Sequence, residues 1–116
     1  AIKNEHTTML GHMTGRLLLG REGYHVNHKE IFHAAKDHGV MIELNANPHR
    51  FDVDWRYGRD LKELGIKVSI NPDAHKVEGI ADYRFGVGIA RKGWLGKKDV
   101  FNTLGLDQVL RVLSSP

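Results

Sequence analysis

Two adjoining stretches decide the fold class: Val40–Leu44, with the sequence VMIEL, and the NANP sequence that follows at 45–48. The first is a short, mostly apolar run typical of a buried strand, and the Asn-Pro step in the second breaks it. The segments His6–Leu10 and Ile66–Ile70 are similar in character and also end at Gly or Asn-Pro sequences. We therefore predict three short strands that end near residues 10, 44 and 70.

Helical patterns separate these strands. One helix is predicted from Asn27 to Gly39, and a second ends at Gly65 after a cap at Asp52 or Asp54. A third helix is expected to present one apolar face formed by Ile80, Tyr83, Val87 and Trp94. Short C-terminal helices are expected to be capped by Asp99 and Asp107. Strand ends about 30 residues apart, with helices between them, indicate an α/β fold with parallel strands and right-handed crossovers.

The length of the chain, 116 residues, is that of one small domain. Parallel sheets usually have more than three strands, with both faces covered. We therefore expect residues 1–116 to be one incomplete domain, the C-terminal portion of a larger α/β barrel or sheet whose exposed surface drives homo-oligomer formation. A complete small α/β domain that dimerises remains the alternative.

Composition excludes several classes of protein. The chain has no cysteine, which excludes disulfide scaffolds, thiolate metal sites and cysteine nucleophiles. The sequence shows neither an apolar run of about 20 residues nor a signal peptide, so we expect a cytoplasmic protein without a membrane partner. The formal net charge of +3 permits an anionic partner, and the eight histidines make a metal site worth testing.

Candidate site residues follow all three predicted strands. The sequences GHMTGR at 11–16, NANPHR at 45–50 and NPDAH at 71–75 fall where ligands gather in α/β folds, at the carboxyl ends of parallel strands. Strand alternation places Glu43 and Asn45 on one face and the apolar residues of the same strand on the other. Each strand therefore has an apolar face for helices and a polar face near its carboxyl end.

Asp73 and His75 form an Asp-x-His pair that could bind one or two metal ions, and His12 lies at the same predicted edge. From the pair alone, a helix-capping Asp beside a surface His is the commoner explanation. Arg16 could bind a phosphate, whereas Asn45 and Asn47 could bind substrate or form turns. The remaining histidines lack metal-ligand spacing, with His49 a minor candidate.

Four motifs in order resemble the PHP (polymerase and histidinol phosphatase) domain, and more narrowly the C-terminal end of bacterial family X DNA polymerases. They are GHxTGRLL at 11–18, IELNANPxR at 42–50, NxDAH at 71–75 and GxxxARKGW at 86–94. The resemblance covers nearly the whole chain. One departure is Met13, where the family often has proline.

The resemblance implies the last part of a distorted β/α barrel, with a multinuclear centre of zinc or manganese and magnesium or iron as further candidates. It implies phosphoester hydrolysis and, in a longer parent polymerase that binds DNA, 3′–5′ exonuclease activity. His12, Asp73 and His75 match the family's metal ligands, with Asp73 and His75 also expected to serve catalysis. Arg16, Asn45 and Asn47 match loop positions near the substrate.

The family's upstream His-x-His motif and the rest of the ligands are missing from this chain. The upstream half of the PHP domain is therefore an expected partner, and activity of the segment alone stays open. Two other functions also stay open: a stand-alone phosphatase acting on a small phosphomonoester, and a non-catalytic module that binds DNA or serves as a scaffold.

Overall fold

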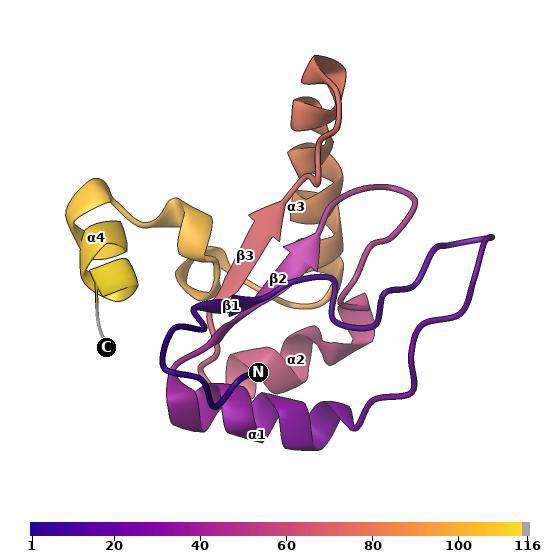
Figure 1. Cartoon of the computed structure of the whole chain (residues 1–116). Helices are drawn as coiled ribbons and strands as arrows, with labels where there is room; N and C mark the ends of the chain where they lie inside the picture. The colour runs from indigo at the N-terminus through magenta and orange to yellow at the C-terminus, as the bar shows by residue number, and fades with distance from the viewer. Residues whose placement is uncertain (115–116) are drawn as a thin grey trace.

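A three-stranded parallel sheet forms the centre of the computed structural model, which describes residues 1–114 (Figure 1). The strands β1 (Met9–Leu10), β2 (Met41–Asn45) and β3 (Val68–Asn71) are arranged in the order β1-β2-β3. Ile42 pairs with Leu10 on one side and with Val68 on the other, so the three strands end at a common edge. The predicted α/β class with parallel strands and crossover helices is confirmed.

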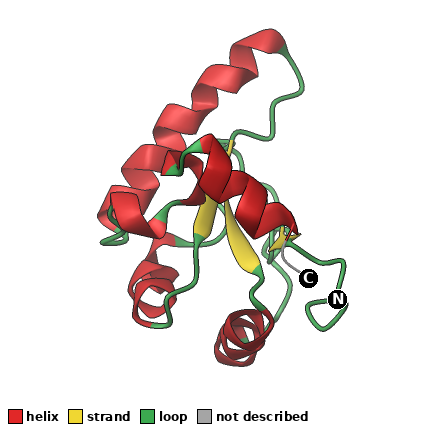
Figure 2. Cartoon of the chain, turned by 90° about the vertical axis from the view of Figure 1, so that its left-hand side faces the viewer, coloured by secondary structure: helices red, strands yellow, loops and turns green. Residues whose placement is uncertain are grey.

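Helices connect and follow the strands (Figure 2). The α-helices are α1 (His28–His38), α2 (Gly58–Glu63), α3 (Tyr83–Lys92) and α4 (Leu106–Ser114), and the 3₁₀ helices are η1 (Trp55–Tyr57), η2 (Val77–Asp82), η3 (Lys97–Asp99) and η4 (Phe101–Thr103). The predicted ends of α1 are confirmed, because the Asn27 side chain accepts a hydrogen bond from the Glu30 amide and Gly39 adopts a left-handed φ of 66°.

The first strand is shorter than predicted, beginning at Met9 rather than at His6. Local hydrogen bonds explain the difference: the Asn4 side chain accepts from the His6 amide, and the Asn4 carbonyl accepts from the Thr7 amide. These bonds form a turn that competes with the strand. Pairing with β2 begins where the Thr8 carbonyl accepts from the Met41 amide.

The predicted face of the third helix is confirmed at Val87, which packs against the core, and is wrong at Ile80, Tyr83 and Trp94, which are exposed. Ile80 belongs to η2 and is 59% exposed, and Trp94 follows the end of α3 and is 67% exposed. The buried residues of α3 are instead Gly86 and Ala90. A Cβ atom at Gly86 would lie only 2.5 Å from Cγ2 of Ile70, so the missing side chain allows α3 to approach the sheet.

The apolar core lies between the sheet and its helices. Its largest buried side chains are Phe32, Ile42, Leu44, Leu61, Val53 and Val68. Leu44 and Ile70 lie near Gly86 of α3, whereas Glu43 and Asn71 point to the opposite, polar face of the sheet. The predicted division into an apolar face for helices and a polar face is confirmed.

The outer edge of β3 is covered by hydrogen bonds, whereas helix α4 leaves large apolar side chains exposed. The Asn102 side chain accepts from the Ile70 amide at 2.7 Å and donates to the Ile70 carbonyl at 3.0 Å, covering the outer edge of β3. In Figure 1, α4 stands apart from the sheet, and Leu106 and Leu110 on it are 72% and 55% exposed. Homo-oligomer formation through exposed apolar surface stays a prediction.

Within residues 1–114, no helix has the length and apolar content needed to cross a membrane.

Candidate functional site

Glu43 connects the ends of all three strands through its carboxylate. Its Oε2 accepts from the His12 amide at 2.7 Å, and its Oε1 accepts from Nδ2 of Asn71 at 2.9 Å. These bonds place the first residues after β1 and the last residue of β3 on either side of one β2 side chain. Glu43 was not predicted as a site residue, although strand alternation placed it on the polar face with Asn45.

Asp73 lies at the same edge, just beyond β3. Its Oδ2 accepts from Nδ2 of Asn45 at 3.2 Å and lies 3.5 Å from Nε of Arg50. Nδ1 of His75 lies 2.8 Å from the Asp73 carbonyl oxygen, within hydrogen-bond distance. The His75 ring therefore contacts the main chain of Asp73, and both residues line a pocket together with Asn47.

His12 and Asp73 both have left-handed backbone conformations, with φ values of 25° and 54°. Such conformations are uncommon outside glycine and concentrate at functional sites. No group of three or more His, Asp or Glu side chains within residues 1–114 is arranged to hold a metal ion. The donors of this segment therefore do not form a complete metal site by themselves, and the joint role of His12, Asp73 and His75 stays a prediction.

The Arg16 guanidinium binds the loop that follows β2. Its Nε donates to the Arg50 carbonyl at 2.8 Å, one Nη donates to Asp54 at 2.8 Å, and the other donates to the Phe51 carbonyl. The side chain is 21% exposed. Arg16 therefore joins the loops after β1 and β2, and its contact with a phosphate stays a prediction.

Asn45 and Asn47 have well-defined local partners. Oδ1 of Asn45 accepts from the Asn47 amide at 3.1 Å, and Oδ1 of Asn47 accepts from the His49 amide at 2.9 Å. Both bonds form the turn that the Asn-Pro sequence predicts. Because Asn45 also donates to Asp73, its position is fixed at the strand edge.

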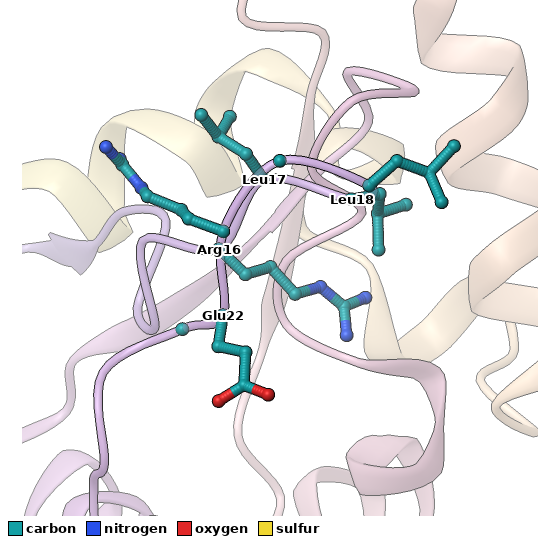
Figure 3. Close-up of a pocket in the computed structure, with 8 residues that line it drawn as sticks. Arg16, Leu17, Leu18 and Glu22 are labelled. Atoms are coloured by element: carbon teal, nitrogen blue, oxygen red, sulfur yellow. The ribbon is translucent and has the colours of Figure 1, made fainter.

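A second pocket is formed by the loop from Arg16 to Gly23 (Figure 3). The Leu17 and Leu18 side chains point to different sides of this loop, and Glu22 points away from both. The Leu18 amide donates to the His49 carbonyl at 2.7 Å, which connects this loop with the one after β2. The leucine-rich pocket is lined by residues 16–23, and neither Asp73 nor His75 lines it.

Asp54 gives the stability of this loop region a predictable pH dependence. Burial alone would raise the pKa of Asp54, but hydrogen bonds from Arg56 and Arg16 outweigh it and hold the pKa well below its ordinary value. A lowered pKa stabilises the fold above the unfolded-state value and loses that contribution as pH falls. We expect Asp54→Asn to cost about 1–3 kcal/mol at pH 7, since it weakens charge-assisted bonds.

Urea denaturation from pH 7 to pH 3 measures this effect. The difference between wild type and Asp54→Asn should narrow as pH falls below about 4, where the unfolded carboxyl takes up a proton. A difference that stays constant across this range would contradict the account.

Known proteins match this chain over most of its length. No family model matches it. The chain is 38% identical over 109 residues to the DNA polymerase/3′-5′ exonuclease PolX of Bacillus subtilis, a match that covers 94% of this chain. It is 25% identical over 112 residues to a probable phosphatase of Thermoanaerobacter sp. (strain X514).

The chain is homologous to a segment of a PHP domain. This PHP segment spans 19% of the PolX relative and 42% of the probable phosphatase. Its open three-stranded sheet fits part of a PHP barrel. PHP homology also implies a metal site in general terms.

Proposed function

We propose that residues 1–116 are the C-terminal part of a PHP domain in a longer parent protein, where they contribute to a metal-dependent phosphoesterase that degrades DNA from its 3′ end. The observation that carries the proposal is the hydrogen-bonded strand edge. There Glu43 contacts the His12 amide, and Asn45 contacts the Asp73 carboxylate. The exonuclease activity in the name of the PolX relative supports the choice of substrate.

In this proposal His12, Asp73 and His75 supply three of the metal ligands, and residues of the upstream half supply the others. Neutral imidazoles suit zinc and manganese, and the Asp73 carboxylate suits harder ions as well. Arg16, Asn45 and Asn47 lie on the substrate side of the site. Because the donors of this segment do not complete a metal site, hydrolysis depends on the upstream half.

Comparing the segment with its parent tests this proposal. We expect the parent to degrade 3′-labelled DNA with added Mn²⁺ or Zn²⁺, and residues 1–116 alone to show little or no degradation under the same conditions. Robust degradation by the segment would contradict the dependence on an upstream half. A parent that hydrolyses a small phosphomonoester but not DNA would favour a phosphatase similar in activity to the probable phosphatases.

An exposed tryptophan supports a second candidate, DNA binding without catalysis. Trp94 is 67% exposed, and the Arg59 guanidinium lies 5.6 Å from the centre of its ring. Four exposed basic residues surround it in the sequence: Arg91, Lys92, Lys97 and Lys98. Aromatic rings that stack on bases, together with cations that contact phosphates, are typical of single-strand binding surfaces.

This candidate predicts that residues 1–116 bind an oligothymidylate and that binding weakens as salt rises. Trp94→Ala should weaken binding by roughly 1–3 kcal/mol, the usual contribution of one stacked base. Fluorescence anisotropy of a labelled oligonucleotide measures the change, and Tyr24→Ala is a control because Tyr24 is 72% exposed and lies in a different loop. Equal binding by wild type and Trp94→Ala would contradict this candidate.

A further inference from the structure

Asp52 is a fully buried carboxylate between the loops that follow β1 and β2. Its exposed fraction is 0%, and its Oδ2 accepts from the Thr14 amide at 2.9 Å and from the Gly15 amide at 3.0 Å. Its Oδ1 has no hydrogen-bond partner within residues 1–114. Burying a carboxyl group is costly unless hydrogen bonds compensate it, and the bonds from these two amides offset part of that cost.

The main chain of Asp52 connects the same residue to the end of β2. Its carbonyl accepts from the Asn45 amide at 2.5 Å, and the two residues form an isolated antiparallel bridge. The Asn45 side chain in turn donates to the Asp73 carboxylate. Asp52 therefore contacts the loop after β1 through its side chain, and reaches the loop after β3 through a single intermediate residue.

The loop held by Asp52 is the one that carries His12. The Gly15 amide that donates to Asp52 also lies 2.9 Å from the His12 carbonyl oxygen and donates to it. Both residues have positive φ values, 25° at His12 and 66° at Gly15. A positive φ is uncommon for a residue other than glycine, so His12 depends on its surroundings to hold this conformation, and Asp52 supplies two hydrogen bonds to the same loop.

We propose that Asp52 is a positioning residue, whose carboxylate fixes His12 relative to Asp73 by holding the amides of Thr14 and Gly15. The inference rests on the proposed function for the joint role of His12 and Asp73, but its structural part is tested without any metal.

A purely stabilising role is the competing explanation, and Asp99 is a matched control for it. Oδ2 of Asp99 accepts from the Gly96 amide at 2.8 Å, and its side chain is 11% exposed. Asp99 ends η3 and pairs with Lys62 at 3.4 Å, so its polar partners, Gly96 and Lys62, lie outside the loop that carries His12. Asp99→Ala should destabilise the fold without changing the His12 loop.

NMR spectra of residues 1–116 separate the two explanations. Asp52→Ala should shift the His12 ring signals and speed hydrogen exchange at Thr14 and Gly15 by roughly 10- to 100-fold, as expected for losing charge-assisted bonds. Asp52→Asn, which keeps one acceptor oxygen, should give smaller changes. Asp99→Ala should lower the unfolding midpoint while leaving the His12 signals and both amides as in wild type.

Unchanged His12 signals and exchange rates in Asp52→Ala, or equal changes in Asp99→Ala, would overturn the proposal. If Asp52→Ala does not fold, Asp52→Asn decides the question, and wild-type His12 signals in that variant would overturn it. In the parent, Asp52→Asn should raise the Mn²⁺ concentration needed for half-maximal DNA degradation. A wild-type parent without such activity would refute the proposed function while the NMR result still decides the role of Asp52.

Discussion

Replacing Asp73 by alanine in the parent protein is expected to lower the rate of 3′-end DNA degradation by roughly 10²–10³-fold, because stabilisation by a bound metal is worth several kcal/mol. Asp73 supplies a carboxylate at the strand edge, where Asn45 and Arg50 hold its Oδ2. We expect any polymerase activity of the parent to stay largely intact, since the resemblance to family X polymerases implies that this chemistry lies outside residues 1–116. The measurement is degradation of 3′-labelled DNA at matched Mn²⁺ concentrations.

Two further variants make this result specific. Asp73→Asn keeps the shape of the side chain while removing its charge, so it should lose most of the activity as well. Asp107→Ala removes a carboxylate from the first turn of α4, away from the strand edge, and should leave degradation unchanged. Full activity of Asp73→Ala would refute the role assigned to Asp73.

The second large effect concerns the contact between α3 and the sheet. A Cβ atom at Gly86 would lie 2.5 Å from Cγ2 of Ile70 and 2.7 Å from Cβ of Ala46. Gly86→Ala should therefore push α3 away from β2 and β3 and cost about 1–3 kcal/mol, the usual penalty of overpacking a core. Urea denaturation of residues 1–116 measures the loss.

Gly88 provides a control in the same helix. A Cβ atom at this position would meet no atom within 4 Å. Gly88→Ala should therefore stabilise the fold by up to about 1 kcal/mol, because alanine favours a helix more than glycine does. Equal stability changes in the two variants would contradict the packing described for α3.

Most of the fold could be predicted because the strand pattern is local. Apolar runs such as Val40–Leu44 end at strong breakers, and their spacing leaves room for crossover helices. The first strand was predicted too long because Asn4 forms a turn with His6 and Thr7. The face of α3 was predicted correctly only at Val87, because apolar periodicity gives weight to large side chains, whereas Gly86 packs closely by having none.

The site was predictable only in part. Strand ends and alternation located the edge where Asn45 contacts Asp73. Helix-capping preferences predicted Asp52 or Asp54 as a cap. Only Asp54 has that role in the structure, where it caps η1 through the Arg56 amide. Asp52 is buried instead, and its partners lie 37 and 38 residues away in the sequence. Local patterns do not reveal such distant partners.

The most direct test of the central claim is the crystal structure of the parent with Mn²⁺, located by its anomalous scattering. We expect manganese to be bonded directly to imidazole nitrogens of His12 and His75 and to the Asp73 carboxylate. The remaining ligands should come from upstream of this segment. Manganese bound elsewhere, or His12 more than roughly 10 Å from both Asp73 and His75, would contradict it, since ligands of a shared metal centre must lie within a few ångströms of its ions.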